Sequence, residues 1–271
     1  GQLVMGAASR LIDTSQLSVG ATGRLQLNSS QTVGNATLAG VLDGTGTLTA
    51  ATYSLQGGQV LAPLGTGVLT STGNSLIDAP AAVTAVGVQS GSLTTGVRGT
   101  FSNLPSVQVE ANASWLLAGN QRIGSLGGAG QVLLDANTLR TGAGANTRFD
   151  GSISGTGSLV KEGGSSFTLG GVNTYTGPTL VNAGTLGGTG TIAGSVTVAS
   201  GATFAPGTSI GTLTRHLSAH AATVRRFVKN TLASLSPKKE PQTLAGVVTL
   251  VRTKVGSRGK MAFVQLDDDG K

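Results

Sequence analysis

The segment at 207–211 reads Gly-Thr-Ser-Ile-Gly and is the clearest candidate for covalent chemistry in the chain. In hydrolases this pattern places a nucleophilic serine, here Ser209, on a sharp turn between a strand and a helix, where an acid and a histidine support it. The only histidines are His216 and His220. Because the pattern also arises easily in a chain with 44 glycines, we interpret it as a turn and predict that the protein is not an enzyme.

Metal and cofactor chemistry find little support in the residue types. His216 and His220 would share one face of a helix, but the glutamate of a His-Glu-x-x-His site does not stand between them. The chain has no cysteine, so a thiolate zinc site is excluded. Gly-x-Gly units recur, yet none continues into the Gly-Lys-Ser/Thr of a phosphate-binding loop. We therefore expect neither a metal nor a cofactor.

Four basic residues near the end of the chain could contact nucleic acid. Arg252, Lys254, Arg258 and Lys260 surround the turn of a predicted β-hairpin. Clusters of this kind attract the phosphate backbone, with strong dependence on salt. Single-stranded DNA is therefore a possible partner, and the alternative is a solvated hairpin that binds nothing by itself.

Charge and glycine divide the chain near Thr214. Residues 1–213 contain seven basic and seven acidic side chains, whereas residues 214–271 contain 11 basic and four acidic ones, a net charge of +7. Of the 44 glycines, 40 precede this point. Such a shift in composition indicates a boundary between two kinds of structure.

The elements that precede the boundary are predicted to be short strands. Apolar residues alternate with polar ones, as in Arg-Leu-Gln-Leu at 24–27, and clusters of Gly, Asn and Ser separate the runs. A Gly-x-Gly unit followed by a polar and an aliphatic residue starts at positions 44, 128, 155 and 188, and a similar unit with Val68 in the polar place starts at position 65. The interval from 65 to 128 is three times the interval from 44 to 65. Repeats of about 20 to 50 residues are typical of solenoids.

The fold class that follows is mainly β, a right-handed parallel β-helix. Glycine at this frequency excludes helical repeats, and the spacing of leucines in leucine-rich repeats is missing. With roughly 20 residues per coil and about 4.8 Å between stacked strands, the stretch before the boundary predicts on the order of ten coils and a rod of about 50 Å.

One stretch carries a family resemblance. It contains Gly-Ser-Leu-Val-Lys-Glu-Gly at 157–163, Thr-Leu-Gly-Gly-Val-Asn-Thr-Tyr-Thr-Gly at 168–177 and Asn-Ala-Gly-Thr-Leu at 182–186. This resembles the autotransporter-associated β-strand repeat of passenger domains in bacterial type V secreted proteins, and residues 195–214 are similar to the coil that ends such repeats.

The resemblance implies a non-catalytic, surface-exposed β-helical stem, with a role in adhesion or display toward an unknown surface ligand. It also implies a cell-surface or secreted location of the Gram-negative type. The translocator barrel of that family is expected to be missing from this chain, and no apolar run approaches the roughly 18 residues of a membrane-spanning segment.

The tail has a different pattern and a different resemblance. Apolar residues spaced by three or four predict an amphipathic helix over 215–236, which Pro237 ends. The motifs Val-Arg-Arg-Phe-Val at 224–228, Leu-Ala-Gly-Val-Val at 244–248 and Arg-Gly-Lys-Met-Ala-Phe-Val at 258–264 resemble the oligonucleotide-binding (OB) module of the bacterial DNA polymerase III alpha subunit. The resemblance implies the first two strands of a five-stranded barrel, without the polymerase's catalytic carboxylates.

We therefore predict three segments: a parallel β-helix over 1–214, an amphipathic helix over 215–236 and a truncated OB-like hairpin over 237–271. The primary hypothesis is a passenger stem fragment joined, as a chimera, to a replicative polymerase fragment. The alternative is a nucleic-acid-binding polymerase fragment, which would be cytoplasmic. A weaker third hypothesis is a surface esterase that uses Ser209.

Overall fold

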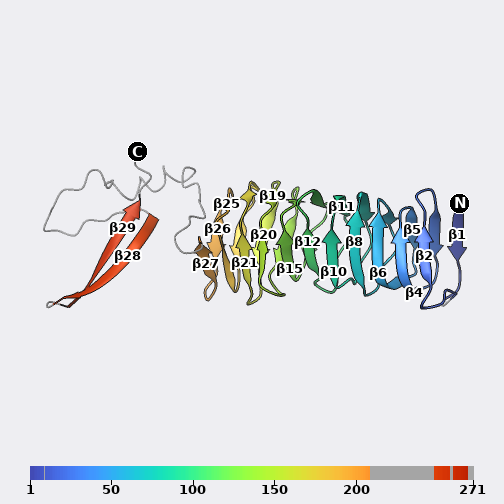
Figure 1. Cartoon of the computed structure of the whole chain (residues 1–271), viewed down its shortest axis with the longest axis horizontal. Helices are drawn as coiled ribbons and strands as arrows, with labels where there is room; N and C mark the ends of the chain where they lie inside the picture. Colours follow the sequence, from blue (N-terminus) through green and yellow to red (C-terminus); the bar gives the residue numbers. More distant parts are fainter. Residues whose placement is uncertain (9, 208–246, 257–258, 268–271) are drawn as a thin grey trace. The chain divides into compact units, whose positions relative to one another are not determined.

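The computed structural model describes residues 1–8, 10–207, 247–256 and 259–267 (Figure 1). The chain divides into two compact units, Gly1–Thr214 and Arg215–Lys271. Each unit is described by itself.

The first unit is a solenoid of parallel strands, β1 to β27, stacked one coil above the next (Figure 1). The longest sheet has eleven strands and therefore records eleven turns, which agrees with the prediction of about ten. Its strands are β2 (Gln16–Val19), β4 (Gln31–Leu38), β6 (Leu48–Gln56), β8 (Val68–Thr72), β10 (Ala85–Val88), β12 (Ser106–Val109), β15 (Ser125–Gly128), β18 (Thr147–Phe149), β21 (Ser166–Leu169), β24 (Thr185–Gly188) and β27 (Thr203–Pro206).

Three smaller sheets complete the coils. The nine-stranded sheet contains β1 (Gln2–Met5), β3 (Arg24–Leu27), β5 (Val41–Gly44), β7 (Gln59–Val60), β9 (Asn74–Ile77), β11 (Gly91–Thr95), β13 (Ala113–Leu117), β16 (Gln131–Leu133) and β19 (Ser152–Ser154). The five-stranded sheet contains β14 (Gln121–Arg122), β17 (Thr138–Thr141), β20 (Ser158–Lys161), β23 (Thr179–Val181) and β26 (Val196–Val198). The two-stranded sheet contains β22 (Val172–Asn173) and β25 (Thr191–Ile192).

The length of a coil in sequence varies along the solenoid. Tyr53 pairs with Leu69 on the next coil, whereas Thr95 pairs with Leu117, so the second of these coils uses more of the chain than the first. Only the strands keep a fixed register, so the difference lies in the corners between them. The coil length predicted from the sequence is thus an average and not a strict period.

The Gly-x-Gly units do not mark one repeated corner, which corrects the interpretation of their spacing. Gly44 ends a strand of the nine-stranded sheet, whereas Gly128 and Gly188 end strands of the eleven-stranded sheet. The long interval from Gly65 to Gly128 is therefore not three equal coils. What Gly44, Gly128 and Gly188 share is local: φ is +109°, +103° and +125°, and a Cβ atom would lie 2.1, 2.1 and 1.9 Å from the carbonyl oxygen of the coil below. Only glycine fits such a corner.

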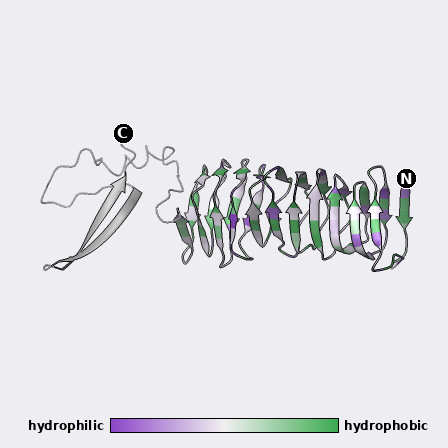
Figure 2. Cartoon of the chain, in the orientation of Figure 1, coloured by the Kyte–Doolittle hydropathy of each residue, from purple (hydrophilic) through white to green (hydrophobic). Residues whose placement is uncertain are grey.

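The core runs through the middle of the coils as one continuous cluster from Val19 to Ile192. Alternate strand residues point inward, as the burial pattern of β3 shows, and Figure 2 shows apolar and polar residues mixed along single strands. The largest fully buried side chain is Trp115. Its indole N–H donates to Thr95 Oγ1 at 3.2 Å, and its ring lies 6.2 Å from that of Phe101. Trp115 thus serves packing.

The described part of the second unit is an antiparallel hairpin of β28 (Val247–Gly256) and β29 (Gly259–Asp267). The register runs from Val247 opposite Asp267 to Gly256 opposite Gly259, with an irregularity between Val248 and Leu250. The helix predicted over 215–236 lies outside the described residues, and the OB assignment stays a prediction. None of the described segments forms an apolar helix of membrane-spanning length.

Candidate functional site

The residues predicted to act chemically fall mostly beyond the solenoid. Ser209, His216, His220 and Arg258 lie outside the described residues. Arg252 and Lys254 lie on β28 and Lys260 lies on β29, with Arg252 opposite Phe263 and Lys254 opposite Met261. The pairing brings the backbones of these three basic residues to the end of the hairpin near its turn, and their role as a nucleic-acid contact stays a prediction.

Within the solenoid, the ionisable side chain of Lys161 is fully buried. Its Nζ donates to the backbone carbonyls of Glu162 (3.0 Å), Gly163 (2.9 Å) and Ala183 (3.0 Å). Three acceptors therefore match the three N–H donors of the ammonium group. Burial lowers the pKa of Lys161, and the carboxylate of Glu162 opposes that shift. A Cβ atom at Gly184 would lie 2.7 Å from Nζ, so glycine is required there.

The sequence contains a signal for this burial. Leu159 and Lys161 are two residues apart on β20, so they face the same side, and an inward Leu159 places Lys161 inward as well. The landmark Leu-x-Lys is visible in the sequence, but the three carbonyls that surround the ammonium come from two coils and cannot be read from it. Lys161 thus joins one coil to the next and has no exposed surface from which to act on a substrate.

Asn173 performs a similar structural task where the nine-stranded sheet ends. Its Oδ1 accepts the backbone N–H of Ile153 at 3.1 Å, while its Nδ2 donates to the carbonyls of Gly171 and Thr191 at 3.0 Å each. The amide therefore links β19 to β25, as a peptide group of a strand between them would. Asn173 is 1% exposed, so its amide cannot contact water or a ligand.

Two tyrosines hold corners from the inside. The Tyr175 hydroxyl lies 2.5 Å from Thr179 Oγ1, and burial raises its pKa well above the ordinary value. The Tyr53 hydroxyl donates to the Leu48 carbonyl and accepts the Ala50 N–H, both at 2.9 Å. Burial raises the pKa of Tyr53 to about 12. Both phenols are neutral hydrogen-bonding groups and not acids or bases.

Four arginines of the solenoid form ion pairs with acidic side chains. Arg98 donates to Asp78 from its backbone at 2.9 Å and from its guanidinium at 2.8 Å, and these hydrogen bonds lower the pKa of Asp78. A hydrogen bond from Arg148 to Asp150 raises the pKa of that arginine. The four pairs are Arg24 with Asp43, Arg98 with Asp78, Arg122 with Glu162, and Arg148 with Asp150.

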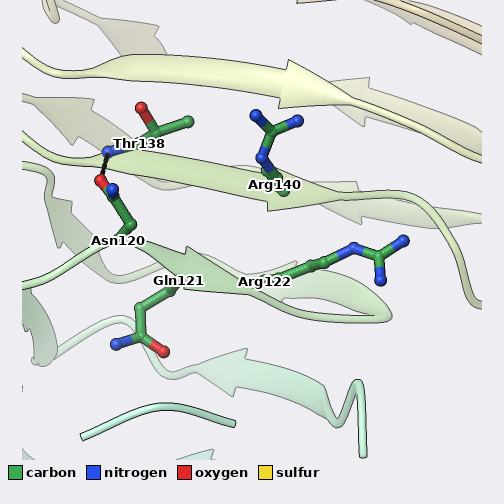
Figure 3. Close-up of a pocket in the computed structure, with 5 residues that line it drawn as sticks. All are labelled: Asn120, Gln121, Arg122, Thr138 and Arg140. Carbon is green, nitrogen blue, oxygen red and sulfur yellow. Dashed lines mark hydrogen bonds between the residues drawn. The ribbon is translucent and has the colours of Figure 1, made fainter. Parts of the chain in front are cut away.

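The described ranges hold no cluster of metal-ligating side chains. No group of three or more His, Cys, Asp or Glu side chains gathers there. A shallow hollow of about 280 Å³ lies over β14 and β17, lined by Asn120, Gln121, Arg122, Thr138 and Arg140 (Figure 3). Its lining residues offer hydrogen-bond donors and two positive charges, and none of them is acidic; the carboxylate paired with Arg122 belongs to Glu162.

A family model, the passenger-associated-transport-repeat, matches residues 159–187. Neither the curated proteins nor the solved structures contain a match to the chain. The matched stretch holds the buried polar residues described above, Lys161, Asn173 and Tyr175, together with Gly184. The repeat and the parallel solenoid support the predicted resemblance to autotransporter passengers, whereas no comparison supports the polymerase resemblance of the tail.

Proposed function

We propose that this chain is a non-catalytic stem segment of an exported passenger protein, a rod that holds or displays a binding surface outside the cell. The observation that carries the proposal is the use of the polar residues within 159–187. Lys161, Asn173 and Tyr175 are all buried and bonded across or within coils. The matched repeat therefore encodes stacking, which is what a stem requires.

The pattern of hydrogen bonds along the coils supports the same role. Backbone groups in the corners bond to the neighbouring coil, as Gly46 N–H does to the Leu27 carbonyl at 2.8 Å and Gly190 N–H to the Leu169 carbonyl at 2.9 Å. Satisfied backbone groups in every layer favour a rigid solenoid whose coils support one another. An adhesive or display role is the function that such a rod would serve.

The location can be tested in cells of the source organism with antibodies raised against residues 1–207. We expect the antibodies to label intact cells or to find the chain in the medium, while an antibody to a cytoplasmic protein labels only permeabilised cells. Labelling that appears only after permeabilisation, with the chain in the cytoplasmic fraction, would overturn the proposal.

A second candidate concerns residues 215–271, which we propose to be a fragment of a polymerase-derived nucleic-acid-binding module. The antiparallel pairing of β28 with β29, which brings the backbones of Arg252, Lys254 and Lys260 toward one end of the hairpin, supports it. Replacing Arg252, Lys254, Arg258 and Lys260 together by Ala should remove salt-dependent binding of a single-stranded oligonucleotide. Replacing Arg10, Arg98 and Arg148 by Ala, in the solenoid, is the control, and equal loss in both variants would reject the hairpin as the site.

A chimeric origin of the chain is part of this second proposal. The two resemblances meet at 213–215 without a linker, and they imply different compartments. Sequencing the source locus across the codons for 205–225 should reveal a junction. One uninterrupted native gene at that locus would remove the chimera hypothesis and leave the stem proposal intact.

A further inference from the structure

The hollow over β14 and β17 contains two arginines in register. Arg122 on β14 pairs directly with Arg140 on β17, so their side chains leave the same face of adjacent strands. Both residues are exposed. Like charges placed directly opposite on neighbouring strands destabilise a sheet. The arrangement therefore calls for negative charge beside both guanidinium groups.

Only one of the two arginines has a counter-charge within the described part of the chain. Arg122 Nε donates to Glu162 Oε1 at 2.5 Å, across the strand that carries Arg140. No described carboxylate pairs with Arg140. The other strand and corner arginines with ion pairs, Arg24, Arg98 and Arg148, each have an acid of their own. Among the described arginines of the solenoid, Arg10 and Arg140 have no ion pair, and of these two only Arg140 lies opposite another arginine on a neighbouring strand.

Further hydrogen-bond donors stand next to Arg140. Asn120 Oδ1 accepts the backbone N–H of Thr138 at 2.8 Å, which leaves the amide NH₂ of Asn120 directed elsewhere. Among the described residues neither this NH₂ nor the Thr138 hydroxyl has a side-chain or backbone partner. Thr138 and Arg140 are two residues apart on β17 and therefore share its outer face. Figure 3 shows Asn120 beside Thr138 and the two arginines further along the same strands.

We propose that this hollow binds an oxyanion, a carboxylate or sulfate carried by an acidic polysaccharide. A guanidinium group presents a planar pair of N–H donors that fits such an anion, and the amide and hydroxyl donors of Asn120 and Thr138 suit the anion or the sugar hydroxyls beside it. The hollow of about 280 Å³ has room for a single sugar unit. The inference deepens the proposed stem function because it names a ligand class for a surface exposed outside the cell.

Binding by the purified full chain tests the proposal, and its outcome does not depend on where the protein is located in cells. The probes are polygalacturonate, which carries carboxylates, dextran sulfate, which carries sulfates, and neutral dextran. We expect one or both acidic polymers to bind and the neutral one not to bind. Because a charged hydrogen-bonded contact is lost, Arg140→Ala should weaken binding about tenfold.

Two further variants separate a built site from general attraction to a basic protein. Arg148→Ala removes the same charge from the solenoid surface elsewhere and should leave binding unchanged. Arg140→Lys keeps the charge but loses the planar pair of donors, and it should bind nearly as weakly as Arg140→Ala. Circular dichroism of each variant checks that the fold is retained.

Several outcomes would overturn the proposal. Equal weakening by Arg140→Ala and Arg148→Ala would indicate attraction by net charge, and unchanged binding by Arg140→Ala would place the ligand elsewhere. If Arg140→Ala weakened binding of a single-stranded oligonucleotide but of neither polysaccharide, the ligand class would be wrong.

Discussion

Lys161 shows that a charged side chain can be buried in a narrow rod when backbone carbonyls replace water. The three carbonyls around its Nζ come from its own corner and from the next coil, so the interaction ties two layers together. Buried ammonium groups are tolerated only when every donor is satisfied. The stability of this region should therefore depend on the amine itself and not only on the volume of the side chain.

Replacement of Lys161 tests that dependence. Lys161→Ala leaves three carbonyls without donors and opens a cavity, so we expect the free energy of unfolding in urea to fall by about 3 kcal/mol. Lys161→Met keeps most of the volume and should lose less, about 2 kcal/mol, because only the hydrogen bonds disappear. If Lys161→Ala left the free energy of unfolding unchanged, the three carbonyls would have to find other hydrogen-bond donors, and the prediction would be wrong.

The ion pair of Asp78 with Arg98 should make the stability of the fold depend on pH. Its pKa lies below the ordinary value of 3.8 because Arg98 donates to the ionised carboxylate. The pair therefore stabilises the folded state above that value, and its contribution is lost as the pH falls through the lower folded pKa. A carboxyl titration by NMR should place the Asp78 midpoint below 3.8, and Arg98→Ala should raise it. An unchanged midpoint in the variant would contradict the assigned cause.

At the scale of elements, the corners are more demanding than the strands. An inward strand position accepts any apolar residue of suitable size. Gly188, by contrast, has a φ of +125°, and a Cβ atom added to it would lie 1.9 Å from the Leu169 carbonyl oxygen. Gly188→Ala should lower the free energy of unfolding by about 2 kcal/mol or more, as strain and steric overlap combine. Gly164, where no atom lies within 4 Å of an added Cβ, is the matched control. Gly164→Ala should be nearly neutral in the same urea titration.

The same contrast explains what the sequence could predict. Alternation of apolar residues, as at 24–27, identifies strands because burial on one face imposes a period of two. Corner geometry has no such period, so the inference that equal Gly-x-Gly units occupy equivalent positions is wrong. The hydrogen bonds of the Asn173 amide could not be predicted from the sequence either, because their partners Ile153 and Thr191 lie about 20 positions away on either side.

At the scale of the whole chain, the solenoid is a one-dimensional stack in which each coil contacts its neighbours. The core cluster continues from Val19 to Ile192 without a break, and the paired surface charges join separate coils, as Arg98 joins Asp78 and Arg122 joins Glu162. Fold class was predictable at this scale because composition and alternation act over the full length. The binding hollow was not, because Arg122 and Arg140 become neighbours only through the register of β14 and β17.

Limited proteolysis tests the continuity of the stack. We expect a resistant fragment that contains residues 1–207, since proteases need several residues of extended, unpaired backbone and the corners bond to the next coil. Mass spectrometry of the fragment identifies its ends. Early cleavage between coils of the solenoid would contradict a continuous core, and one resistant unit that also included 247–267 would contradict the division at Thr214.

The corners of the solenoid differ in length, but the height of each layer along its axis does not depend on them. Hydrogen bonding between parallel strands fixes the rise of each layer at about 4.8 Å, both in the short coil from Tyr53 to Leu69 and in the longer one from Thr95 to Leu117. Extra residues therefore widen the cross-section of one coil at its corner. They do not change the position of the later layers along the axis. A ligand-binding feature on one face, such as the neighbouring arginines Arg122 and Arg140, therefore keeps its position along the solenoid axis when the loops around it become longer or shorter.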